Sequence, residues 1–313
     1  MAEMNRIPYV LITPVRNEAA TIGETIRSVC RQSLPPREWV IVSDQSVDQT
    51  DEIIKEQASK HSFIHFLRLD QRPARSFASA VFVIEAGIAA LKTRDYNFIG
   101  FLDGDIRLGD SYYEDLIHRF ENDPKLGLAG GLAVDRIKGE RRRHAQSPTE
   151  VAGAVQFFRR QCFESLGGLI ALPEGGWDAI TCVQARRQGY GTRTFFEIEV
   201  DHLKPRNIAE GNIFRRHRQF GTRDYALGYH PLFEVLKCGY RCFKPPLFIG
   251  GLMWLAGYTG CYLSRRKRML PPDIIQFIRR EQLRRLRWLH GPEVVPVAPN
   301  APAAPAGHGV TER

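Results

Sequence analysis

Short apolar runs alternate with segments of helical periodicity over roughly the first third of the chain. We predict buried strands at residues 9–14, 39–42, 64–67 and 98–102, because each is a continuous apolar run of strand length that ends at polar or turn-forming residues. Between these runs, apolar residues recur at helical spacing over residues 21–32, around Ile53 and Ile54, and over residues 77–92. This order predicts an α/β fold with a mostly parallel sheet and helices on both of its faces.

Beyond residue 110 the pattern is less regular. Residues 126–134 predict a strand interrupted by glycines, residues 178–189 a helix, and residues 195–202 a late strand. In the late strand Glu197, Glu199 and Asp201 alternate with apolar residues, so their side chains share one face, which we interpret as solvated. The basic residues 141–144 are expected to form a mobile loop.

Two apolar segments stand out in the last third of the chain. Residues 247–263 are shorter than the roughly 20 residues that a spanning helix needs, which favours a re-entrant or interfacial segment over a true span or a buried helix. Residues 273–290 combine a helical apolar spacing with five arginines, a pattern typical of a basic amphipathic helix on an anionic membrane surface. Packing of this helix against the rest of the protein is the alternative.

The charge of the chain is concentrated near its C-terminus. Residues 204–290 hold 18 Lys and Arg against 5 Asp and Glu, whereas residues 1–203 hold 25 against 28. This asymmetry favours a polyanionic partner for the basic region. We therefore divide the chain into residues 1–203, a basic helical region of residues 204–290 that includes the segment 247–263, and a disordered Pro/Ala-rich tail of residues 291–313.

The cysteines and the N-terminus bear on the cellular compartment of the protein. The six cysteines include no C-x-x-C pair and no second ligand pair for zinc, which predicts reduced thiols in a cytosolic setting. The N-terminus leads into a strand without an apolar signal segment, so secretion is not expected.

The candidate chemistry centres on Asp103-Gly104-Asp105, directly after the strand at residues 98–102. Carboxylates at such a strand end lie where an open α/β sheet builds its site. Two of them can share one Mg²⁺ or Mn²⁺ ion, which keeps open positions for the phosphates of a nucleotide diphosphate. A solvated turn is the alternative. Asp44 ends the second strand and is placed to accept from a base or ribose. Arg72 and Arg75 lie near a helix start, where they would meet a diphosphate, and surface charges are the alternative for them.

Three sequence stretches, residues 12–18, 42–50 and 101–105, resemble the family 2 glycosyltransferases of GT-A fold, and the similarity extends over roughly residues 7–203. The resemblance implies that the loop after the first strand and the Asp after the second strand hold the nucleotide, and that the D-x-D motif binds metal and diphosphate. These roles fall on Pro14, Arg16, Glu18, Asp44 and Asp103, with Asp105 as the direct metal ligand. The chain departs from the commoner pattern at residues 43–45, where two adjacent Asp and a Gly are replaced by Ser, Asp and Gln, and this leaves the base open.

The resemblance also implies a catalytic base and a third metal ligand. From the residues alone, Asp178 at a helix start is a cap, but the family places its general base at this point of the chain. His202 ends the late strand, where the family often has a His near the metal, and a structural role is the alternative.

The resemblance and the basic region together imply an inverting glycosyltransferase at the cytoplasmic face of the cell membrane. It would move a sugar from a nucleotide-diphosphate donor to a hydroxyl of a glycan or polyprenyl-linked acceptor, with Mg²⁺ or Mn²⁺ and without nucleic acid. An inactive membrane- or polyanion-binding scaffold of the same fold is the alternative. A phosphohydrolase is disfavoured because its Asp-x-Asp follows the first strand, and residues 218–220 depart from the motif of processive synthases.

Overall fold

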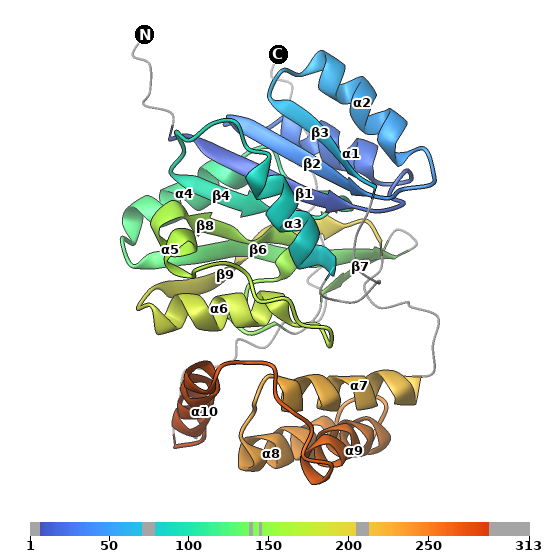
Figure 1. The fold of residues 1–313 in the computed structure, drawn as a ribbon, viewed down its shortest axis with the longest axis vertical. Coiled ribbons are helices and arrows are strands. Elements are labelled where there is room, and N and C mark those ends of the chain that lie inside the picture. The colour runs from blue at the N-terminus through green and yellow to red at the C-terminus, as the bar shows by residue number, and fades with distance from the viewer. Residues whose placement is uncertain (1–6, 71–78, 138–139, 144–145, 205–212, 288–313) are drawn as a thin grey trace, which may run out of the picture.

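The computed structural model describes residues 7–70, 79–137, 140–143, 146–204 and 213–287. A twisted sheet with helices on both faces forms the larger part, and a group of helices from the last third of the chain lies beside it (Figure 1). The predicted tail, residues 291–313, lies outside the described residues.

The first half of the sheet follows the predicted alternation of strands and helices. Its elements are β1 (Tyr9–Val15), α1 (Ile22–Cys30), β2 (Glu38–Asp44), α2 (Thr50–Lys60), β3 (Ile64–Leu69), α3 (Ser79–Ala89) and β4 (Phe98–Phe101). The strands β1, β2, β3 and β4 pair in parallel. Along β1, Tyr9 and Leu11 point into one buried cluster with α1 and α2, and Val10 and Ile12 point into a second cluster with α3. Because both faces are covered, the strands are apolar throughout.

The second half of the sheet is mixed. It comprises β5 (Ile106–Arg107), α4 (Tyr112–Asn122), β6 (Leu126–Ile137), β7 (Glu140–Arg143), a 3₁₀ turn η1 (Gly153–Val155), β8 (Phe157–Arg159), α5 (Arg160–Ser165), α6 (Trp177–Arg187) and β9 (Gly191–His202). The strand order is β3-β2-β1-β4-β8-β6-β9-β5, with β7 paired to β6. Strand β8 runs antiparallel to β4 and β6, so the parallel order predicted for the sheet holds in the first half and is interrupted in the second.

Two expectations for the second half are wrong. Residues 140–143 form β7, which pairs antiparallel with β6, rather than a loop, and His144 lies outside the described residues. Arg141 of β7 contacts Glu199, and Arg136 Nε on β6 lies 2.9 Å from Asp201 Oδ1. Glu199 and Asp201 do share one face of β9 as predicted, but arginines of the neighbouring strands cover them, so they are ion-paired rather than solvated. Glu197 remains exposed.

The apolar segment of the last third forms a helix that packs on another helix. The helices here are α7 (Ile213–Ala226), α8 (Pro231–Arg241), α9 (Ile249–Leu263) and α10 (Pro272–Arg287). Helices α7 and α9 approach so closely that a Cβ atom on Gly257 would lie 2.0 Å from the carbonyl oxygen of Arg218. Helix α9 has 15 residues, and none of the helices in the described ranges is both long and apolar enough to cross a bilayer.

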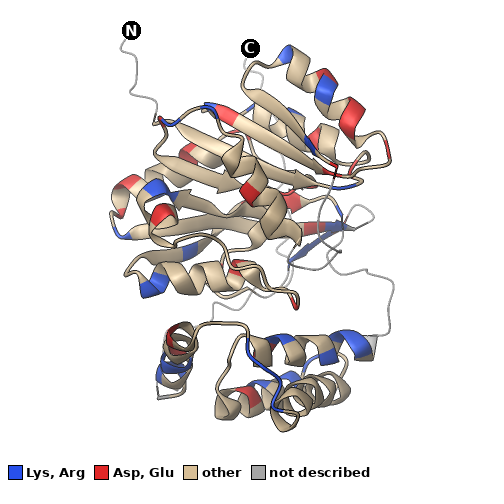
Figure 2. Ribbon diagram, viewed as in Figure 1, with Lys and Arg blue, Asp and Glu red and all other residues tan. Residues whose placement is uncertain are grey.

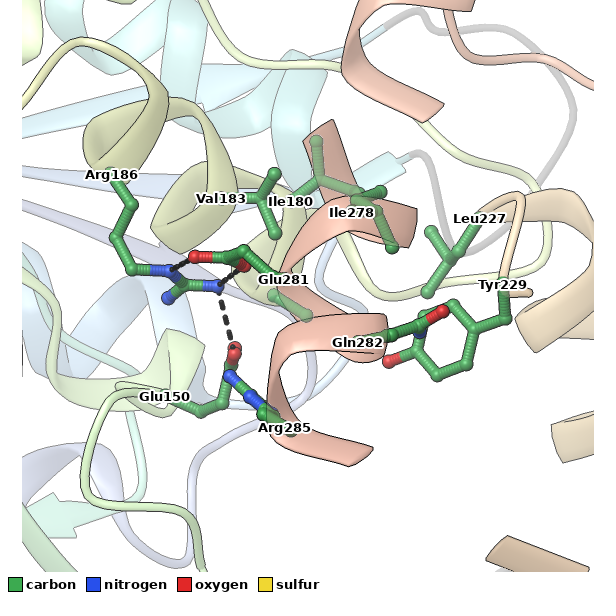
Figure 3. Close-up of a pocket in the computed structure, with 11 residues that line it drawn as sticks. Glu150, Ile180, Val183, Arg186, Leu227, Tyr229, Ile278, Glu281, Gln282 and Arg285 are labelled. Carbon is green, nitrogen blue, oxygen red and sulfur yellow. Dashed lines mark hydrogen bonds and ion pairs between the residues drawn. The ribbon is translucent and has the colours of Figure 1, made fainter. Parts of the chain in front are cut away.

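Helix α10 is amphipathic as predicted, but its apolar face packs inside the protein. Ile274 and Ile278 belong to a buried cluster with Ile180 on α6. Arg186 of α6 donates from Nε and Nη2 to the two carboxylate oxygens of Glu281, at 2.8 and 3.0 Å, beside a small pocket of about 40 Å³ (Figure 3). The structure therefore shows the alternative given for this helix, packing against the rest of the protein, in place of a membrane contact through its apolar face.

Candidate active site

A pocket of about 300 Å³ brings together residues from distant parts of the chain. Its lining includes Pro14 near the end of β1, Asp103 after β4, Asp178 at the start of α6 and His202 at the end of β9. These four were singled out from the sequence for three different roles. The remaining lining residues are Ala80, Ala152, Gly153, Ala154 and Trp177.

The carboxyl ends of β1 and β2 bring two further candidate residues together. Because β1 and β2 are adjacent and parallel, their carboxyl ends meet, and Arg16 Nη1 lies 3.5 Å from Asp44 Oδ2. The loops after the two strands are joined further by Asn17, whose Oδ1 accepts from the Val47 backbone N–H at 2.9 Å and whose own N–H donates to Ser46 Oγ at 3.2 Å. Arg16 and Asp44, both predicted to hold the nucleotide, are thus close in space, and Asp44 is only 5% exposed.

Glu18 lies in the same loop but is not among the residues that line the pocket. Its Oε2 accepts from Lys204 Nζ at 2.6 Å and from Thr21 Oγ1 at 2.9 Å. Burial raises the pKa of the Glu18 carboxyl, the Lys204 ammonium opposes this, and the negative charge of Asp105 adds to it. Sequence reasoning missed Lys204. The available signal was its position two residues after His202, at the end of a strand that leads into the site.

The D-x-D segment is held in a turn between β4 and β5. The backbone N–H of Asp103 donates to the carbonyl of Ala154 at 3.0 Å, and Thr25 Oγ1 donates to the carbonyl of Gly104 at 2.9 Å. A Cβ atom on Gly104 would lie 2.6 Å from Val15 Cγ1, closer than side chains pack. Glycine between the two carboxylates therefore lets the turn lie directly against the end of β1.

Asp105 faces His202, and a third residue lies behind the imidazole. Pairing of β5 with β9 sets Ile106 opposite His202, and Asp105 Oδ2 lies 3.5 Å from His202 Nε2. On the other side, His202 Nδ1 lies 3.1 Å from Asp135 Oδ1 on β6, and Asp135 is only 1% exposed. Sequence reasoning missed Asp135. Its signal was an acidic residue that follows an apolar stretch within a strand.

The donor set fits a hard divalent cation. Carboxylate oxygens and an imidazole nitrogen are ligand types that Mg²⁺ and Mn²⁺ accept, and a carboxylate behind a ligating His is the usual arrangement for fixing its ring. In the part of the chain that the structure describes, no three His, Cys, Asp or Glu side chains converge into a metal cluster. A cation here would therefore complete its shell with phosphate oxygens and water, as Mg²⁺ commonly does.

Asp178 lines the same pocket from the start of α6. Its Oδ2 accepts from the backbone N–H of Gly153 at 3.3 Å, and its carbonyl accepts from Gln156 Nε2 at 3.0 Å. The preceding Trp177 packs edge-on against Phe101 of β4, with ring centroids 6.2 Å apart. These contacts fix the first turn of α6 against η1 and leave the Asp178 carboxylate lining the pocket.

Two candidate site residues are not placed. Arg72 and Arg75 lie outside the described residues, in the segment before α3. Helix α3 contributes Ala80 to the pocket, so the described part of this helix does reach the site.

Comparison with known proteins gives the family. Residues 10–190 match the family described as glycosyl transferase family 2. Over 154 residues the chain is 32% identical to the poly-beta-1,6-N-acetyl-D-glucosamine synthase of Staphylococcus epidermidis, which covers 49% of this chain and 34% of that protein. The synthase of the same name from Staphylococcus aureus (strain COL) is 30% identical over 115 residues, or 37% of this chain and 26% of that protein. The chain therefore matches about a third or less of the length of these curated relatives.

Solved structures agree on the fold. The mannosyltransferase PcManGT from Pyrobaculum calidifontis, in complex with GDP-Man and Mn²⁺, has a TM-score of 0.57 at 16% sequence identity, covering 84% of this chain and 89% of that chain. Residues 1–349 of S. aureus TarS, in complex with UDP-GlcNAc, give a TM-score of 0.53 at 12% identity, covering 82% and 73%. At these identities the likeness concerns the fold alone. With the match over residues 10–190, it shows that the chain belongs to glycosyl transferase family 2 and has a GT-A fold.

Proposed function

We propose that the chain is an inverting glycosyltransferase that moves a sugar from a nucleotide-diphosphate donor to an acceptor hydroxyl. The observation that carries the proposal is that Asp103, His202 and Asp178, which come from three distant elements, all line a single pocket. A donor diphosphate and an acceptor hydroxyl could then meet within one space. Single-step transfer needs both groups in contact range at the same time.

The donor side is assigned to the loops after β1, β2 and β4. Pro14, Arg16 and Asp44 hold the nucleoside, with Glu18 and Lys204 fixing the loop behind them. Asp103 and Asp105 hold the diphosphate and a divalent cation, with His202 as a further ligand. When bound, Mg²⁺ or Mn²⁺ supplies positive charge that stabilises the departing diphosphate. The structural relatives described with GDP-Man and Mn²⁺ or with UDP-GlcNAc support this assignment.

Asp178 is assigned as the general base. Its carboxylate takes the proton of the acceptor hydroxyl while the hydroxyl oxygen attacks the anomeric carbon of the sugar. The bond from that carbon to the diphosphate oxygen breaks, and the diphosphate leaves with the bonding electrons. One displacement from the opposite side inverts the anomeric configuration. The N–H of Gly153, which donates to Asp178 Oδ2, holds the carboxylate in place for this step.

The acceptor is assigned as a glycan or a polyprenyl-linked sugar at the cytoplasmic face of the cell membrane. The curated relatives are named for N-acetyl-D-glucosamine and the TarS structure holds UDP-GlcNAc, so UDP-GlcNAc is the first donor to test. The basic region of residues 204–290 supports an anionic membrane surface as partner rather than nucleic acid, because this region combines its charge with exposed apolar side chains.

The proposal is tested with Asp178→Asn, which keeps the shape of the side chain and removes its basicity. Release of nucleoside diphosphate from a panel of nucleotide sugars is measured with short glycans and polyprenyl-linked sugars as acceptors. We expect Asp178→Asn to lower turnover by roughly a hundredfold or more while donor affinity stays near that of the wild type.

Asp115→Asn is the matched control, because Asp115 also lies in the first turn of a helix, α4, away from the pocket. This variant should turn over at the wild-type rate. Equal rates for Asp178→Asn and the wild type would refute the base assignment. A wild-type protein that neither binds nor cleaves any donor would favour the inactive scaffold.

A further inference from the structure

Helices α8 and α9 expose apolar side chains that no described residue covers. Helix α9 contains no charged residue. Two of its leucines, Leu252 and Leu263, are nevertheless 58% and 79% exposed to solvent. Phe243, in the connection before it, is 73% exposed. We define the α8–α9 surface by its exposed residues: Leu232, Val235, Leu236, Tyr240, Phe243, Leu247, Phe248, Ile249, Leu252 and Leu263.

This exposure does not result from loose packing of the two helices. The opposite side of α9 is tightly packed: Trp254 and Tyr258 are buried, and Gly250 and Gly257 lie against α7. On α8 the buried side holds Glu234 and Cys238. A helix that is apolar all round belongs in a core or a membrane, and α7 and α8 together leave part of α9 uncovered. In Figure 1, α8 and α9 lie farther from the sheet than α7 does.

The charges around the α8–α9 surface have one sign. Residues 225–272 contain seven Lys and Arg and one acidic residue, Glu234, which is fully buried. Lys244 is exposed between the helices, and Arg265 and Lys267 are exposed just beyond α9. Figure 2 shows the basic segment that follows α9 beside this helix, which itself carries no charged residue. An apolar face with a cationic border and no exposed carboxylate matches the acyl and headgroup layers of an anionic bilayer.

We propose that the α8–α9 surface binds an anionic lipid membrane, with its aromatic and aliphatic side chains in the headgroup region and its basic border on the lipid phosphates. The protein then lies on the membrane through this surface, and α10 packs on the catalytic domain instead. Membrane binding by this surface would hold the site close to a membrane-bound acceptor, and this consequence rests on the proposed function. Arg266 contacts Glu174, and the side chain of Arg223 lies against Gly176, so the bound region adjoins the loop that leads to Asp178.

The test is co-sedimentation of the full chain with vesicles made of equal parts phosphatidylglycerol and phosphatidylcholine, and with vesicles of phosphatidylcholine alone. We expect tighter binding to the anionic vesicles. Combining Phe243→Ser with Leu252→Ser should weaken this binding at least about tenfold. Combining Arg265→Glu with Lys267→Glu should weaken it by a similar factor, and by less at high salt. Phe82→Ser removes an exposed aromatic side chain from α3 and should bind as the wild type does.

A second measurement, the rise in melting temperature on addition of nucleotide, tests the proposed function independently of membrane binding. The surface variants should keep the wild-type shift, which also shows that they are folded. Wild-type protein that stays in the supernatant with anionic vesicles would overturn the inference. Vesicle binding that survives Phe243→Ser with Leu252→Ser would overturn it too, as would a wild-type dimer that this variant converts to a monomer. Vesicle binding without any nucleotide shift would uphold the inference and contradict the proposed function.

Discussion

His202 Nδ1 lies 3.1 Å from Asp135 Oδ1, inside the sheet, while the opposite ring nitrogen faces Asp105. Both His202 and Asp135 are buried, so the orientation of the ring is set by protein contacts rather than by solvent. For a His that ligates a metal through Nε2, a carboxylate beside Nδ1 fixes the orientation of the ring. Asp135 is therefore assigned as a positioning residue behind the proposed metal site.

Asp135→Asn should raise the Mn²⁺ concentration needed for half-maximal activity by about 10- to 100-fold. Turnover at saturating Mn²⁺ should change much less, because Asp135 does not line the pocket. The measurement is a metal titration of nucleoside diphosphate release. Asp201→Asn is the control, since Asp201 is also ion-paired but contacts arginines instead of His202. An unchanged metal requirement for Asp135→Asn would remove the positioning role.

Gly104→Ala should weaken donor binding by tenfold or more. The new methyl group would lie 2.6 Å from Val15 Cγ1, so the turn carrying Asp103 and Asp105 must move. Overpacking of this kind also costs about 1–3 kcal/mol of unfolding free energy. Calorimetric titration with nucleoside diphosphate and Mn²⁺ measures the affinity. At Gly109 a Cβ atom would meet nothing within 4 Å, so Gly109→Ala should bind normally. Equal affinities for the two variants would show that the turn need not touch β1.

Arg186→Ala should destabilise the docking of α10 on α6. Arg186 is mostly buried between Glu150 and Glu281, and its loss leaves both carboxylates without their common partner. Removing one member of such a group costs about 3 kcal/mol. Urea unfolding measures this loss, and trypsin should cleave at Arg279 and Arg280 faster than in the wild type.

The neighbouring Arg187 provides the matched control. It pairs with Asp273 at 2.6 Å, but both side chains are substantially exposed. Exposed pairs contribute about 1 kcal/mol or less, so Arg187→Ala should leave stability and cleavage of α10 nearly unchanged. A similar effect of the two substitutions would mean that the pairing with Glu150 and Glu281 is unimportant for docking.

Stability should depend on pH through Glu234. Burial raises the pKa of its carboxyl from 4.5 to about 7, the Lys237 ammonium opposes this and Asp224 adds to it, with Cys238 and Arg223 also nearby. The unfolded chain releases this proton near its ordinary pKa, whereas the folded protein holds it to about pH 7. The free energy of unfolding therefore falls by on the order of 3 kcal/mol as the pH rises between these two values.

Glu234→Gln should remove that fall, because the amide resembles the neutral acid. The variant should be more stable than the wild type at about pH 8 and similar to it at about pH 4. Glu52→Gln, at an exposed position on α2, should follow the wild type at every pH. Parallel pH curves for Glu234→Gln and the wild type would show that Glu234 titrates normally.

The first half of the fold and the donor side of the site were predictable from the sequence. A parallel strand covered on both faces is a continuous apolar run, so the ends of β1, β2 and β4 are visible in the pattern. Parallel pairing then places those ends side by side, which brings Arg16 near Asp44 and sets Asp103 beside Pro14. The assignment of Asp178 as the general base required the resemblance to the family, because an Asp at a helix start is ordinarily a cap.

Contacts in the second half depend on register and on partners distant in sequence. The pairing of β6 with β9 shifts register between Gly131 and Leu132, so the meeting of Asp135 with His202 is not visible in any local pattern. Strand β7 is exposed along its length and has no apolar alternation to reveal it. For α10, an amphipathic pattern is the same whether lipid or protein covers the apolar face, and its partner Ile180 lies far earlier in the chain.

The central claim is that the D-x-D turn holds a nucleotide diphosphate with a divalent cation. The most direct measurement is the melting temperature of the protein with UDP, GDP, CDP or dTDP, with and without Mn²⁺, for the wild type and Asp105→Ala. A ligand at about a hundred times its dissociation constant adds roughly 2.7 kcal/mol, a shift that is easily measured. We predict a Mn²⁺-dependent rise with one nucleotide that Asp105→Ala abolishes. No rise with any nucleotide, or an equal rise in Asp105→Ala, would contradict the account.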